Sequence, residues 1–159
     1  MLTIYDTWLT FDCGVFVMTV RTLRGHHLLC VHGFQGMGYS PGFVKKMETI
    51  VEDIRDPEKD FPIRVVVDLD DACTACPHNG GSFCAASAGS DAHVKGLDER
   101  AIAHLKLEDG KLYRKSKLVE WTARTLEPED LDQICKGCSW LSYGVCKAGI
   151  RKLNEEWRR

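Results

Sequence analysis

The chain has 159 residues, with 21 basic and 23 acidic side chains, a formal net charge of -2 and eight cysteines. This length predicts one domain with a core of its own, and the near balance of charge lacks the positive field typical of proteins that bind nucleic acid or anionic membranes. Since no apolar run reaches the ~18 to 20 residues of a membrane-spanning helix, we expect no nucleic acid and no membrane as partners.

The first 17 residues differ in character from the rest. They are mostly apolar, yet they carry Asp6 and Asp12 and lack both the basic start and the small-residue cleavage site of a signal peptide. Met18 opens the polar segment "MTVRTLRGHHLLC". We therefore expect residues 1–17 to be a non-native or disordered extension, residues 18–159 to form a single cysteine-rich domain, and the protein to be cytoplasmic. Intact-mass measurement of the native protein tests the expected start.

The predicted elements begin with a short strand at 20–23, followed by one or two helical turns in "HHLLCVHGF". Ser40 suits an N-cap and Pro41 suits the first position of a helix. Apolar residues then recur at helical spacing, which predicts a helix over 41–56. The run "IRVVVDL" is short and rich in β-branched residues, so it predicts a buried strand at 63–69.

Helices dominate the second half of the predicted structure. A loop is expected at 89–96, then a helix over about 97–107, another over about 118–125, and a short one that opens at Pro128. Apolar residues every three or four positions after Cys146 predict an amphipathic C-terminal helix. Its N-terminal end favours a thiolate at Cys146, because the helix dipole stabilises negative charge there. The fold class is therefore α+β, a mostly helical single domain with a small β-sheet.

Six of the eight cysteines fall in two segments of identical spacing, "CTACPHNGGSFC" at 73–84 and "CKGCSWLSYGVC" at 135–146. Each holds a Cys-x-x-Cys pair, whose turn lets both thiolates face one metal, and then a third cysteine. Asp-Leu-Asp precedes both, which fits either a duplication or convergence on one ligand geometry. Clustered thiols in the cytoplasm more often bind metal than form disulfides. We predict two cysteine-rich metal-binding loops with these ligands: Cys73, Cys76, Cys84, Cys135, Cys138 and Cys146.

The number of thiols bears on the cofactor. A zinc ion is satisfied by four ligands, so one zinc does not require six thiolates. An iron–sulfur cluster typically takes four cysteines, although the spacing here matches neither the bacterial nor the plant-type ferredoxin pattern. We expect one or two 4Fe–4S clusters, with zinc as the alternative. Either one cluster draws ligands from both segments, or each segment supplies three ligands to its own cluster and a fourth comes from elsewhere.

Additional cofactor-binding residues are predicted in "RGHHLLC". On a helix, His26 and His27 lie on the same face as Cys30, which makes Cys30 the leading candidate for an extra ligand. Arg24 is suited to stabilise a thiolate nearby. The competing interpretation is that Cys30 is a small buried hydrophobe and the histidines are ordinary core residues. His78 is a candidate ligand or proton donor, or simply a solvated loop residue.

The ordered motifs "LRGHHLLC", "GFQGMGYSP", "CTACPHNGGSFC" and "DLDQICKGCSWLSYGVC" resemble the domain of unknown function 1284 family, small proteins described as iron–sulfur binding. The resemblance runs from about residue 20 to the C-terminus and leaves residues 1–17 outside. It implies that the six clustered cysteines bind the iron–sulfur cluster, with Cys30 and His26 or His27 close by. It implies no reaction.

Several functions fit these expectations. The one we expect is electron transfer to an unknown redox partner protein, with every iron bound by the protein. The second is an enzyme in which one iron stays open to a substrate and His26, His27 or His78 transfers protons. The others are a zinc-stabilised interaction module and a thiol–disulfide redox protein. Whether the chain is catalytic stays open.

Overall fold

The computed structural model describes residues 19–158, so the extension predicted over 1–17 lies outside the described residues. The described chain is mostly helical with one small sheet, which confirms the α+β class. In chain order the main elements are β1 (Arg21–Arg24), α1 (His27–Gly33), α2 (Pro41–Arg55), β2 (Pro62–Val66), α3 (Ser90–His104), β3 (Leu112–Arg114), α4 (Lys115–Thr125), α5 (Leu131–Ile134) and α6 (Val145–Trp157). None of the helices within 19–158 has the length and apolar character needed to cross a membrane.

The sheet has the order β1-β2-β3. β1 runs parallel to β2, with Leu23 opposite Val65, and β3 runs antiparallel to β2, with Tyr113 opposite Ile63. All four of these side chains are buried. The strands β1 and β2 were predicted, whereas β3 was not, because three residues are too few to display the alternation that marks a strand.

α2 forms as its sequence predicts. The Ser40 hydroxyl accepts a hydrogen bond from the backbone N–H of Phe43 at 3.1 Å, and Pro41 occupies the first turn. The cap satisfies a donor that would otherwise lack a partner at the helix start. The apolar stripe faces the core, and its buried members are Phe43, Met47, Ile50, Val51 and Ile54.

α3 begins seven residues earlier than the predicted helix, at Ser90. Its first two turns are partly or fully exposed, so they carry no apolar periodicity from which the helix could be predicted. Gly89, at φ 80°, turns the chain into this helix. Asp91 in the first turn pairs with Lys95 at 2.9 Å. The expected loop at 89–96 is therefore wrong, because polar helix turns resemble loops in sequence.

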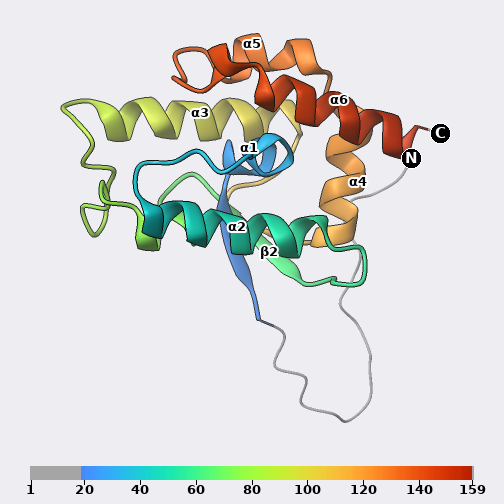
Figure 1. Ribbon diagram of the computed structural model, residues 1–159, viewed down its shortest axis with the longest axis horizontal. Helices are drawn as coiled ribbons and strands as arrows, with labels where there is room; N and C mark the ends of the chain where they lie inside the picture. Colours follow the sequence, from blue (N-terminus) through green and yellow to red (C-terminus); the bar gives the residue numbers. More distant parts are fainter. Residues whose placement is uncertain (1–18, 159) are drawn as a thin grey trace.

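α1 lies between α2 and α6 and contacts both (Figure 1). It crosses α6 at two glycines: a Cβ at Gly33 would lie 2.5 Å from the Cα of Cys146, and a Cβ at Gly149 would lie 2.3 Å from the carbonyl oxygen of His32. Only glycine permits backbones to approach so closely. This crossing sets Cys30 of α1 beside the start of α6.

Candidate metal centres

The seven described cysteines are free thiols, and they gather in two groups. The three-thiol group lines a cavity of about 390 Å³ and consists of Cys73, Cys76 and Cys84. The four-thiol group surrounds a smaller cavity of about 10 Å³ and consists of Cys30, Cys135, Cys138 and Cys146. The two segments of equal spacing thus belong to separate groups, and Cys30 joins the second. Cys30 and Cys138 also line the larger cavity, so the two cavities are neighbours.

Both Cys-x-x-Cys pairs adopt the same turn. The backbone N–H of Cys76 donates to the carbonyl of Cys73 at 3.0 Å, and that of Cys138 donates to the carbonyl of Cys135 at 2.9 Å. The third cysteine of each segment has a different setting: Cys146 lies in the first turn of α6, whereas Cys84 lies in a loop. The backbone N–H of Cys84 donates to the Asp91 carboxylate at 2.8 Å. The likeness of the two segments is therefore limited to the paired turn.

The four-thiol group is largely buried. Its members come from α1, from the turn after α5 and from the start of α6. Burial raises the pKa of Cys135 to about 12. The hydrogen bond between the thiols of Cys30 and Cys146 raises the pKa of Cys30, as does burial, and lowers the pKa of Cys146. The lowered pKa of Cys146 belongs to a thiol at the helix N-terminus, where a thiolate was predicted.

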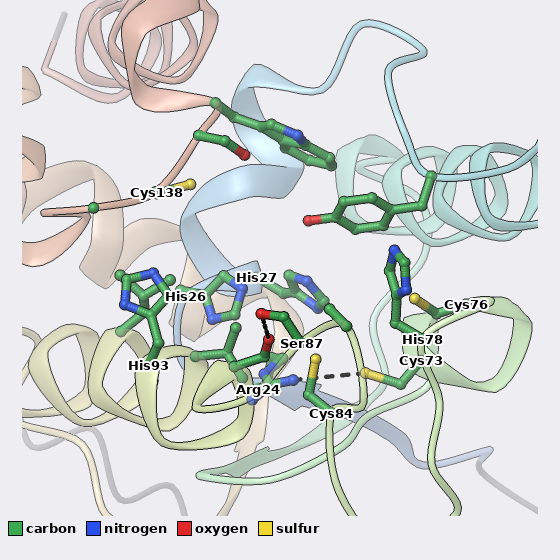
Figure 2. A pocket seen from close by; sticks show the side chains of 18 of the residues that line it. Arg24, His26, His27, Cys73, Cys76, His78, Cys84, Ser87, His93 and Cys138 are labelled. Atoms are coloured by element: carbon green, nitrogen blue, oxygen red, sulfur yellow. Dashed lines mark hydrogen bonds between the residues drawn. The ribbon is translucent and has the colours of Figure 1, made fainter.

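The three-thiol group lies next to a buried arginine. Burial raises the pKa of Cys73 to about 12, and burial also raises the pKa of Cys76. The Nη1 atom of Arg24 lies 3.7 Å from the sulfur of Cys73, as Figure 2 shows. Arg24 thus lies where its positive charge would stabilise a thiolate at Cys73.

Asp98 holds Arg24 and His26 in place. Its carboxylate accepts from Arg24 Nη2 at 2.8 Å and lies 2.6 Å from His26 Nδ1. Asp98 is fully buried, and Gly25 allows this contact because a Cβ there would lie 2.4 Å from the Asp98 carbonyl oxygen. Burial alone would raise the pKa of Asp98, but hydrogen bonds from His26 and Arg24 lower it. Burial lowers the pKa of His26 to about 4, so its imidazole is neutral near pH 7.

Asp70 connects His27 to the first cysteine turn. One carboxylate oxygen lies 2.7 Å from His27 Nδ1, and the other accepts the backbone N–H groups of Ala72 and Cys73 at 3.0 and 3.2 Å. Burial alone would raise the pKa of Asp70, but His27 and the hydrogen bonds outweigh burial and lower it well below its usual range. The carboxylate therefore stays charged while it orients both a histidine and a thiol.

The larger cavity has an aromatic wall. Tyr39 stacks on Trp140 with ring centroids 5.7 Å apart, and its other ring neighbours are Phe43 at 5.3 Å and His78 at 5.0 Å. Burial and, to a smaller extent, the surrounding thiols raise the pKa of Tyr39 to about 12. His93 lines the same cavity from α3. Figure 2 shows the labelled histidines around this cavity, with Cys138 apart from the other three labelled sulfurs.

The structure thus places every predicted site residue in or between the two groups. Within residues 19–158, however, no three His, Cys, Asp or Glu side chains already form a site that could hold a metal ion. Sequence reasoning missed Asp70 and Asp98. The repeated Asp-Leu-Asp before each cysteine segment was a signal for Asp70, whereas Asp98 resembled an ordinary solvated helix residue.

A family model described as protein of unknown function (DUF1284) matches residues 38–144, which is more than half of the chain. The match includes both Cys-x-x-Cys pairs and Cys84, whereas Cys30, His26, His27 and Cys146 lie outside it. Neither the curated proteins nor the solved structures contain a match to the chain.

Proposed function

The chain belongs to the DUF1284 family, and we propose that it is an iron–sulfur protein that carries electrons to a redox partner protein. The observation that carries this proposal is the four-thiol group. Cys30 comes from α1 and its three partners come from the C-terminal segment, yet all four line one small cavity. Four cysteine thiolates are the usual ligand set of an iron–sulfur cluster, so the chemistry of the donors fits this cofactor.

In the chain without a metal, the buried thiols are protonated. Burial keeps Cys73 and Cys135 protonated near pH 7, because it raises the pKa of each to about 12. Metal ligation requires thiolates, so binding would release these protons. The cofactor, when bound, supplies one-electron chemistry, and the chain supplies burial and the charge of Arg24.

The larger cavity supports a second candidate function, that of an enzyme. The three-thiol group faces a cavity of about 390 Å³ that four histidines also line. A cluster bound there by three thiolates alone would leave an iron open to a substrate, as in the enzyme hypothesis.

Zinc is the competing metal, because four thiolates also satisfy a structural zinc site. Iron, acid-labile sulfide and zinc should therefore be measured in protein purified without oxygen, together with the visible spectrum and the EPR spectrum of the reduced form. We expect brown protein with about eight iron and eight sulfide per chain, for two clusters of four iron atoms each. Colourless protein with stoichiometric zinc would overturn the proposal.

Substitution of single cysteines tests the division into two groups. Cys135→Ser should remove about half of the iron by disrupting the four-thiol group, and Cys76→Ser should remove the other half. Cys13→Ser is the control, since Cys13 has no partner at motif spacing. Full retention of iron and sulfide in both Cys135→Ser and Cys76→Ser would show that the ligands are assigned wrongly.

A further inference from the structure

The three-thiol group has no fourth cysteine of its own. Cys30 and Cys138 also line the larger cavity, but both line the small cavity of the four-thiol group as well. There the Cys30 thiol bonds to Cys146, and Cys138 forms its turn with Cys135. An iron–sulfur cluster typically has four protein ligands. A cluster at Cys73, Cys76 and Cys84 therefore either takes a fourth ligand of another residue type or keeps one iron open.

His27 offers a free ring nitrogen to this cavity. Its Nδ1 is engaged by Asp70, and its Nε2 has no partner among the described residues. Every buried side-chain nitrogen and oxygen of the described chain has a hydrogen-bond partner, so Nε2 is not a buried atom. His27 lines the cavity and its side chain is 11 % exposed, so Nε2 can be reached from there.

Asp70 orients the ring for ligation. Metal-binding histidines commonly donate the second ring N–H to a carboxylate, which fixes the tautomer and leaves the other nitrogen as the ligand. The same carboxylate accepts the backbone N–H of Cys73 at 3.2 Å. One buried group thus sets the relative positions of a thiol and an imidazole, which a shared cofactor requires.

The other histidines of the cavity are less suited to this group. His26 has a carboxylate partner in Asp98, but it also lines the small cavity of the four-thiol group. His78 packs edge-on against Tyr39, and His93, on an exposed turn of α3, lies over Gly137. Neither histidine has a carboxylate partner among the described residues. Figure 2 places His27 between His26 and the three sulfurs.

We propose that His27 Nε2 is the fourth ligand of an iron–sulfur cluster bound by Cys73, Cys76 and Cys84. This inference rests on the proposed function, since it presupposes that the cluster exists. A fourth ligand would leave no iron open, which is what an electron carrier needs. Replacing a thiolate by a neutral imidazole also raises the reduction potential of a cluster, so the two centres would differ in potential.

Pulsed EPR of reduced protein labelled with ¹⁵N-histidine tests the assignment directly. We expect a ¹⁵N hyperfine coupling from a directly bound nitrogen in the unsubstituted protein. His27→Cys should retain the iron and sulfide content, because it keeps four ligands, but should lose this coupling and titrate at a lower potential. His93→Gln is the matched control, since it lines the same cavity, and it should keep the coupling.

Three results would overturn the assignment. Iron–sulfur protein without any ¹⁵N coupling would mean that the three-thiol cluster keeps an open iron, which supports the enzyme candidate and leaves the proposed cofactor intact. A coupling that persists in His27→Cys but disappears in His78→Gln or His26→Gln would identify another histidine. Protein without iron and sulfide would overturn the proposed function and this assignment with it.

Discussion

At the residue scale, Asp98 is the side chain on which the polar interior depends. It is fully buried and accepts from Arg24, which is 3 % exposed, as well as contacting His26. A buried ion pair contributes little net stability, but removing one partner leaves an uncompensated charge. The arginine that reaches Cys73 therefore depends on a carboxylate that lies on another element.

We expect Asp98→Ala to lower the free energy of unfolding by about 3 to 5 kcal/mol, because Arg24 would be left buried without its partner. Urea denaturation monitored by circular dichroism measures this change. Glu129→Ala is the control: its pair with Arg151, at 3.7 Å, is exposed, so a change of at most about 0.5 kcal/mol is expected. Equal effects of the two substitutions would contradict the role assigned to Asp98.

At the scale of elements, the crossing of α1 and α6 assembles the four-thiol group. Cys30 is the fourth residue of α1 and Cys146 the second of α6, and the glycines at the crossing let the two helices approach. The Arg55 side chain also donates to the carbonyl of Val31 at 2.9 Å and so anchors the end of α1 to α2. The position of Cys30 is thus set by helix packing on both sides.

Gly149→Ala should force the helices apart, because the new Cβ would lie 2.3 Å from the carbonyl oxygen of His32. We expect a loss of about 1 to 3 kcal/mol in unfolding free energy. In protein purified without oxygen, we also expect loss of the iron that the four-thiol group is proposed to bind. Gly42→Ala is the control, since a Cβ there meets only Ser40 Oγ, at 4.0 Å. That variant should keep its iron and be neutral or more stable by up to about 1 kcal/mol. Normal iron content in Gly149→Ala would show that the crossing does not control the site.

At the scale of the whole molecule, the cysteine segments join the core through buried thiols such as Cys135 and Cys146, while much of their length lies at the surface. The core draws apolar side chains from all six helices and the three strands. Most residues of 77–89 and 136–144 are instead exposed, with their thiols turned inward. The core should therefore stay folded whether or not a metal is bound, whereas the proposed metal would hold the two segments in place.

Removing the proposed cofactor with a chelator should accelerate amide hydrogen exchange at 73–89 and 135–144, while Met47 and Ile50 in the middle of α2 stay protected. Local opening follows from few apolar contacts and exposed backbone. Exchange measured by mass spectrometry, before and after chelation, provides the comparison. A uniform rise over the whole chain would mean instead that metal binding and global folding are coupled.

The elements that were predicted correctly are those marked by a local sequence pattern. α2 follows from its apolar stripe and from Ser40, and α6 follows from the periodicity after Cys146. The start of α3 and the strand β3 were missed, because exposed helix turns and a three-residue strand leave no periodic signal. β3 was missed because it is stabilised by pairing with β2, which lies far away in sequence, and the start of α3 was missed because its turns bury no apolar stripe.

By itself, the sequence determined which side chains are candidate ligands and that each Cys-x-x-Cys pair turns back on itself, since both depend on residues close together in the chain. Only the tertiary structure decided which thiols lie together in the three-thiol group and which in the four-thiol group. The crossing of α1 with α6 assigns Cys30 to the C-terminal segment, and Asp70 and Asp98 hold His27 and Arg24 beside the first segment. These partnerships join residues far apart in sequence, and they arise from helix packing and from buried charges that must find a partner.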